Sequence, residues 1–192
     1  MPSSSTPPPL ELRLRGFDFT SYAEAQAKVF FQLREPAYVP SGLSLQRVAL
    51  FVPPAEWASS TDQRDTILRQ VQTGEYQLGS VWVTSVYRGT SESWSRQPYF
   101  VIEQGKPGDL SLYTYYPEDA RGIIELEDGS TAMWIRGEWT AAPESPGAQL
   151  VHPNSIQIYR ELPDNTAIKL HTYNLLLDEA VRIVNSLQPV PR

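Results

Sequence analysis

Two histidines, His152 and His171, are the only imidazole groups that the chain offers for acid–base or metal chemistry. A serine nucleophile needs a base and an orienting acid, and the sequence contains no Gly-x-Ser-x-Gly elbow. His152 precedes a proline in an expected loop, whereas His171 falls within an expected strand. The pair lacks the i, i+4 spacing of a helical zinc site, and the sequence contains no Asp-rich calcium loop. We therefore expect no catalytic residue, no metal ligand and no cofactor.

Carboxylates are the second possible source of chemistry, because the chain carries 22 Asp and Glu residues. Two carboxylates placed across a cleft hydrolyse glycosidic bonds when one of them has a raised pKa. Choosing a catalytic pair among so many acidic residues has almost no specificity. The four candidates for such a pair are Glu103, Glu118, Asp119 and Glu138. A hydrolase acting on a glycan or a cell-envelope polymer is therefore the alternative to a non-enzymatic role.

Aromatic side chains are more informative than the ionisable ones. Indole rings on a curved sheet can line a groove for acyl chains, peptides or sugars, although core packing is the simpler interpretation of any one ring. The residues that we expect as possible ligand or partner contacts are Trp82, Trp94, Ile123, Trp134 and Trp139.

Composition limits what kind of protein presents these residues. A chain of 192 residues with 41% hydrophobic content is expected to form one domain, which we place at 16–189 after a flexible Ser/Pro-rich linker at 1–15. The net charge of −6 and the scattered Lys and Arg residues argue against a nucleic-acid partner. No apolar run is long enough to cross a bilayer, so we expect a soluble chain that is attached to a membrane only through an anchor outside it. The absence of Cys is compatible with an extracytoplasmic setting.

Helical periodicity marks both ends of the domain. Ser21 and Glu24 have capping-box spacing ahead of an apolar stripe, which predicts a helix from Tyr22 to Arg34. A closing stripe from Leu176 to Leu187 predicts a C-terminal helix. Between them, an apolar stripe at Ile67, Leu68 and Val71 fits either a short helix closed by Gly74 or an irregular segment.

Strand-like segments lie between these helices. Runs rich in β-branched and aromatic residues predict strands at 45–52, 78–87, 99–104 and 110–115. Helix, several antiparallel strands and helix together predict an α+β fold. We expect a curved antiparallel sheet, or half-barrel, with the N- and C-terminal helices packed on one face.

Two hairpins allow a test of register. With Asp128-Gly129 as a two-residue loop, one face carries Ile124, Leu126, Thr131, Met133 and Ile135. Ile123 then lies opposite Trp134 on the reverse face, which predicts an apolar spot there. In the second hairpin, an odd-length loop at Pro163-Asp164-Asn165 unites Ile156, Ile158, Leu162, Ile168 and Leu170. Its predicted solvent face carries Tyr159, Glu161, Lys169 and His171.

Several motifs resemble a bacterial domain of unknown function. They are the strand entry Tyr38-Val39-Pro40-Ser41-Gly42-Leu43, the segment from Met133 to Trp139, the Ile156-to-Tyr159 strand and the closing helix. The resemblance spans roughly 37–187. That domain commonly follows a membrane anchor in proteins related to anti-sigma factors and other cell-surface regulators. The chain departs from it by extra residues between Pro53 and Gln77.

The resemblance implies a fold similar to that of lipoprotein carriers and sigma-factor regulators, a half-open antiparallel barrel covered by helices around an apolar cavity. It supplies no catalytic residue. We therefore expect a non-enzymatic extracytoplasmic binding or sensor domain, membrane-tethered in the full-length protein. It would hold an apolar small molecule, a lipid or a protein segment on the concave face of its sheet.

Overall fold

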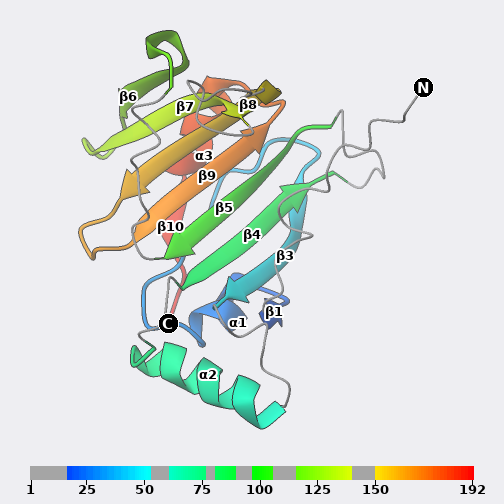
Figure 1. Cartoon of the computed structure of the whole chain (residues 1–192), viewed down its shortest axis with the longest axis vertical. Coiled ribbons are helices and arrows are strands. Elements are labelled where there is room, and N and C mark those ends of the chain that lie inside the picture. The colour runs from blue at the N-terminus through cyan, green and yellow to red at the C-terminus, as the bar shows by residue number, and fades with distance from the viewer. Residues whose placement is uncertain (1–16, 53–60, 77–80, 90–96, 106–115, 140–149) are drawn as a thin grey trace.

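An open, eight-stranded antiparallel sheet forms the centre of the protein (Figure 1). The structure is a computed structural model, which describes residues 17–52, 61–76, 81–89, 97–105, 116–139 and 150–192. The strand order across the sheet is β1-β3-β4-β5-β9-β8-β7-β6. In chain order the strands are β1 (Phe17–Phe19), β3 (Ser44–Phe51), β4 (Trp82–Arg88), β5 (Tyr99–Gly105), β6 (Arg121–Glu125), β7 (Thr131–Trp139), β8 (Leu150–Glu161) and β9 (Ala167–Tyr173).

The helices and a small second sheet surround this sheet. The helical elements are α1 (Tyr22–Gln26), α2 (Thr61–Thr73), α3 (Leu177–Asn185) and the 3-10 helix η4 (Glu118–Ala120). The second sheet pairs β2 (Arg34–Pro36) with β10 (Leu187–Pro189). The predicted α+β class with a curved antiparallel sheet is confirmed. Within the described ranges, none of the helices is both long enough and apolar enough to cross a membrane.

The sheet has one helix-covered face and one outer face. In Figure 1, α3 lies behind β8 and β9, so the outer face is turned toward the viewer. Ile102, Leu170 and Ile158 are aligned across β5, β9 and β8 on the helix-covered face, and each is at most 1% exposed. The buried residues of α3 join the same core. Apolar side chains at alternate strand positions therefore pack against the apolar stripe of a helix.

The N-terminal helix begins as predicted and ends much earlier. Ser21 accepts a hydrogen bond from the Glu24 amide at 3.2 Å, but α1 stops at Gln26 rather than at Arg34. The Gln26 side chain is buried, donates to the Phe31 carbonyl at 2.9 Å and accepts from the Leu33 amide at 2.7 Å. A side chain that bonds the backbone ahead of it competes with the helical pattern. The predicted end at Arg34 is therefore wrong.

The other predicted elements correspond to observed ones where they are described, except that the C-terminal helix ends at Asn185 and Leu187 belongs to β10. The strands at 45–52, 78–87 and 99–104 correspond to β3, β4 and β5, whereas 78–80, 110–115 and the linker at 1–15 lie outside the described residues. The short helix forms as α2, with Val71 fully buried. Gly74 has a φ of 75°, which allows the chain to leave that helix.

The β8–β9 hairpin has the predicted odd-length loop. Leu162 donates to the Thr166 carbonyl at 2.8 Å, and Ile158 lies opposite Leu170 on the helix-covered face. The opposite face is less solvent-exposed than predicted, because Tyr159 is buried and His171 is half-buried. The outer face carries a second, smaller apolar cluster, which consists of Val86, Tyr99, Val101 and Tyr173. The sheet therefore buries side chains on both faces.

Candidate functional site

The turn between β6 and β7 is a three-residue loop rather than the predicted two-residue one. Leu126 donates to the Ser130 carbonyl at 2.8 Å, and Gly129 donates to the Leu126 carbonyl at 2.9 Å. Gly129 has a φ of 77°, in the left-handed region. These features define a type I turn followed by a bulge at glycine. The loop is thus one residue longer than an Asp-Gly turn, and the register shifts by one residue.

This shift places Ile123 and Trp134 on opposite faces of the sheet. Ile123 lies opposite Met133, and Gly122 lies opposite Trp134. The predicted pairing of Ile123 with Trp134 is wrong, because a slip of one residue moves every side chain of a strand to the other face. Trp134 is on the helix-covered face, where it packs against the main core. Ile123 is on the outer face and is 69% exposed.

Gly122 makes room for the indole of Trp134. A Cβ added at Gly122 would lie only 2.5 Å from Trp134 Nε1. The Arg136 guanidinium lies 5.7 Å from the centre of the same ring. Trp134 is therefore held by contacts within its own chain, which is the core-packing interpretation of that residue.

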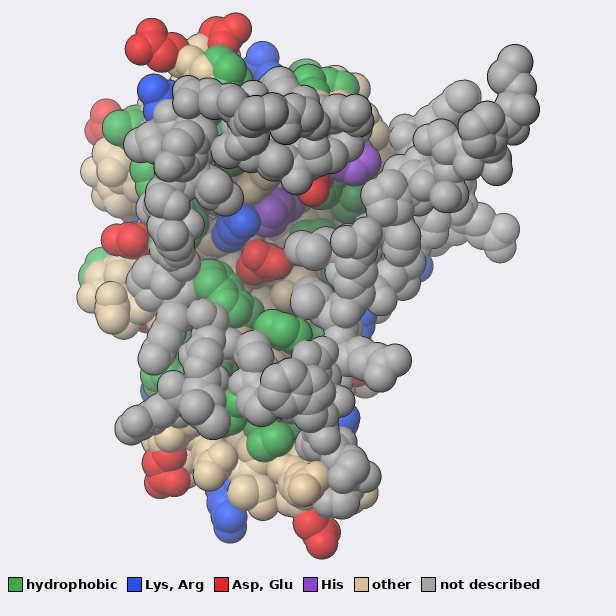
Figure 2. Space-filling model, in the orientation of Figure 1, with side chains coloured by type: hydrophobic (Ala, Val, Ile, Leu, Met, Phe, Trp, Pro, Cys, Tyr) green, Lys and Arg blue, Asp and Glu red, His purple; other side chains and the backbone are tan. Residues whose placement is uncertain are grey.

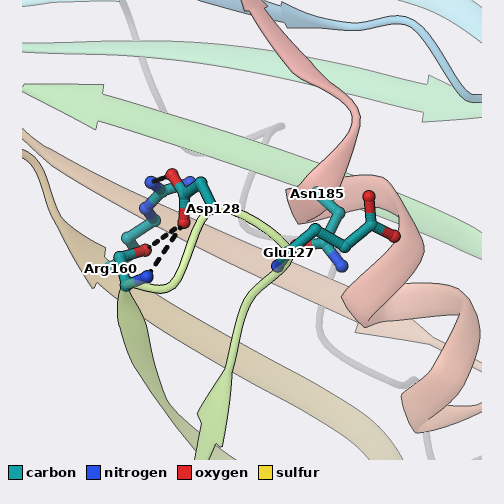
Figure 3. A network of polar contacts seen from close by, with 5 residues as sticks. Glu127, Asp128, Arg160 and Asn185 are labelled. Atoms are coloured by element: carbon teal, nitrogen blue, oxygen red, sulfur yellow. Dashed lines mark hydrogen bonds and ion pairs between the residues drawn. The ribbon is translucent and has the colours of Figure 1, made fainter.

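The turn is tied to two other elements (Figure 3). The Asp128 carboxylate forms an ion pair with Arg160 of β8, and Asn185 of α3 accepts from the Glu127 amide at 3.2 Å. Asp128 also accepts from the amide and hydroxyl of Ser130 at 3.1 and 2.6 Å. The Ser130 donors, followed by Arg160, lower the pKa of Asp128 to about 2. These contacts hold the β6–β7 hairpin in a defined position.

β6 is one of the two end strands of the eight-stranded sheet, and β1 is the other. Leu126 directs its N–H and C=O into the hairpin, so the alternation of an antiparallel ladder directs those of Ile124 the same way. The backbone groups of Ile123 and Glu125 therefore point away from β7. In the described part of the chain, no other strand pairs with β6. An exposed β-branched side chain beside backbone groups that no described strand pairs with is what the addition of an extended segment requires.

Both histidines lie beside a carboxylate. His171 Nε2 is 3.7 Å from Glu103 Oε2, and His152 Nε2 is 4.0 Å from Glu138 Oε2. The Tyr173 hydroxyl donates to Glu138 at 2.9 Å. Figure 2 shows histidine, acidic and basic side chains gathered near the middle of the outer face. These contacts between strands were missed at the sequence level, because they depend on the pairing of segments that are far apart in the chain.

The electrostatics of Glu103 differ from those of a general acid. Burial alone would raise the pKa of Glu103, but His171 and then Lys169 outweigh it, so the pKa is lowered. A carboxylic acid that protonates a leaving group needs a raised pKa. Glu118 and Asp119, two further candidates, are exposed on η4. Among the described residues, no three His, Asp or Glu side chains are grouped to hold a metal ion.

The other predicted contact residues do not gather around Ile123. Trp82 lies on the outer face of β4, opposite Phe51, and is separated from β6 by four strands. Trp94 lies outside the described residues, as does the side chain of Trp139. The described positions thus do not form one aromatic surface.

Two pockets flank the ring of Phe30, which is 42% exposed. Their volumes are about 260 and 360 Å³, and both are lined by Phe30 and Arg192. Pockets that enclose a drug-sized molecule measure roughly 300–1,000 Å³. One Phe30 pocket is therefore smaller than that range and the other is near its lower limit. They give less support to a bound small molecule than β6 gives to an extended segment.

Comparison with known proteins adds no relative: no protein-family model, curated protein or solved structure matches the chain. The resemblance to the anti-sigma-factor-related domain therefore stays a prediction.

Proposed function

We propose that the protein is a non-enzymatic binding domain that holds an extended protein segment along the open edge of β6. The observation that carries the proposal is Ile123, which is 69% exposed beside the outward-facing backbone groups of β6. A segment added here would gain main-chain hydrogen bonds from the edge and apolar contact from Ile123. The ligand class is thus a protein segment, one of the classes expected from the sequence.

The choice of the edge over the concave face follows from packing. Ile102, Ile158 and Leu170 are at most 1% exposed on the helix-covered face, so these positions are occupied by the core. At the edge, by contrast, the contacts of Asp128 and Glu127 hold the hairpin before any ligand arrives. An edge that is ordered in advance loses less conformational entropy on binding.

The alternative, a hydrolase with paired carboxylates, receives less support. The direction of the pKa shift of Glu103 is opposite to that required of the acid. We retain an extracytoplasmic, membrane-tethered setting as part of the proposal, supported by the absence of Cys from the sequence. Fusions of the full-length protein to a reporter that is active only outside the cytoplasm test this setting, and an inactive fusion would reject it.

Selection from a phage-displayed random-peptide library tests the binding role. We expect selected peptides with alternating apolar residues, as an added strand requires. Their affinity should fall by about tenfold or more for Ile123→Lys, because lysine on an edge strand opposes pairing. Leu176→Lys is the matched control, since Leu176 is 73% exposed at the start of α3. Peptides that bind the Ile123→Lys variant as well as the unaltered chain would overturn the proposal.

A further inference from the structure

The outer-face residues of β6 carry a charge pattern that is complementary to its own reverse. Arg121, Ile123 and Glu125 occupy alternate positions, so their side chains share the outer face of the sheet. Ile123 is at the centre, and opposite charges stand two residues to either side of it. A copy of this strand running antiparallel, centred on the same residue, would therefore meet it with opposite charges.

We propose that the segment bound by β6 is β6 of a second copy of this chain, paired antiparallel about a two-fold axis at Ile123. The inference rests on the proposed function, because it names the occupant of the same edge. Each Ile123 lies opposite its counterpart, and Arg121 of each copy lies opposite Glu125 of the other. Two eight-stranded sheets thereby join into one continuous sheet.

The backbone register is compatible with an axis at Ile123. Ile123 points both its N–H and its C=O away from β7, so a two-fold pair at Ile123 exchanges two hydrogen bonds. Arg121 and Glu125 have the same parity and form equivalent pairs on either side. An axis at Gly122 or Ile124 would also pair outward-facing residues, but it would place Ile123 opposite Arg121 or Glu125, so the charge pattern selects the axis at Ile123.

The length of β6 sets the extent of this pairing. η4 ends the extended backbone on one side of Arg121–Glu125 and the β6–β7 turn ends it on the other, so only these five residues can pair. The Arg121 side chain also interacts within its own chain, so its contact with Glu125 of the second copy would be shared. Interfaces of this small size give weak complexes. The dimer should therefore depend strongly on protein concentration.

Sedimentation equilibrium of the full chain over a range of concentrations tests the pairing. We expect a monomer–dimer equilibrium that Ile123→Lys abolishes and that Leu176→Lys leaves unchanged. Glu125→Arg places arginine opposite arginine, and Arg121→Glu places glutamate opposite glutamate. Each variant alone should dimerise about tenfold more weakly, because like charges directly opposite each other destabilise a strand pair.

Mixing the two charge variants is the decisive part of this sedimentation experiment. In the mixed pair, both cross-strand contacts again join an arginine to a glutamate, so a heterodimer should form with an affinity within about threefold of the unaltered dimer. Recovery also shows that both variants are folded, and the double variant R121E/E125R should restore the homodimer.

A chain that is monomeric at every concentration, a dimer insensitive to Ile123→Lys, or mixed variants without recovery would each overturn the self-pairing. If library peptides still bind through Ile123 in any of these cases, the proposed function stands without it. If neither a dimer nor Ile123-dependent peptide binding were found, both the self-pairing and the proposed function would be overturned.

Discussion

Substitution of Gly122 by alanine tests the register that places Ile123 on the outer face. The added Cβ would lie 2.5 Å from Trp134 Nε1 and 3.0 Å from Trp134 Cε2. The indole must therefore move out of its place against the core. Forcing extra atoms into a packed site costs about 1–3 kcal/mol. We expect Gly122→Ala to lower the free energy of unfolding by about that amount.

The same substitution should be harmless once the ring is gone. In a Trp134→Leu background, alanine replaces glycine in a strand, which stabilises by about 0.5–1 kcal/mol because alanine loses less backbone entropy on folding. The two substitutions should therefore be coupled by about 1.5–4 kcal/mol in a double-mutant cycle, which is the difference between the two effects.

Urea unfolding of the four proteins, followed by circular dichroism, measures this cycle. If the changes in the free energy of unfolding caused by the two substitutions add to within about 0.5 kcal/mol, the ring does not cover Gly122. That result would refute the three-residue turn, the observed register and the placement of Ile123.

Three further predictions concern the contacts that support the hairpin and the start of the domain. Gly129→Ala should lower the free energy of unfolding by about 1–2 kcal/mol in a urea titration, because φ is 77° there, whereas Gly129→Asn should cost less. The free energy of unfolding of the unaltered chain should exceed that of Asp128→Asn by a full and constant amount above pH 3.8, the unfolded-state pKa. This difference should disappear as the pH falls toward 2, because the folded-state pKa of Asp128 is about 2. Urea titrations at each pH test this, and a difference that does not change with pH would contradict it. Gln26→Leu should destabilise by about 1–3 kcal/mol by leaving the Leu33 amide unpaired, and a thermal melt unchanged from that of the parent chain would contradict this role.

Local signals accounted for the general architecture. Runs rich in β-branched and aromatic residues located β3, β4 and β5, and of the two interpretations of the stripe at Ile67, Leu68 and Val71, the helix is the one that forms as α2. The β8–β9 register was also correct, since only an odd-length loop unites Ile158 and Leu170 on one face. These successes rest on contacts between segments that are close in sequence.

The β6–β7 register failed because an Asp-Gly pair suits two kinds of turn. The two-residue and three-residue loops both place glycine at a positive φ, so composition alone does not separate them. A usable signal was the parallel between Leu126-Glu127-Asp128-Gly129-Ser130 and Leu162-Pro163-Asp164-Asn165-Thr166. Both Asp residues accept from the Ser or Thr two positions later, and Asn165 has a φ of 60°. The same residue types at the same spacing indicated that the two loops have the same length.

The histidine–carboxylate contacts and the end of α1 depended on longer-range structure. His171 meets Glu103 only because β9 pairs with β5, which no local pattern specifies. The buried Gln26 similarly acts on a backbone segment whose path is set by β2 and β10. The open edge at β6 also required the full strand order, although the alternation of Arg121, Ile123 and Glu125 was visible in the sequence.

Amide hydrogen exchange at β6 tests the central claim most directly. At low concentration, the Ile123 and Glu125 amides should exchange rapidly, whereas the Ile124 amide, which faces β7, should be protected. Addition of a library-selected peptide should slow exchange at Ile123 and Glu125 and leave Ile124 unchanged. Unchanged exchange at Ile123 and Glu125 in the presence of bound peptide would contradict the assignment of this edge as the binding site.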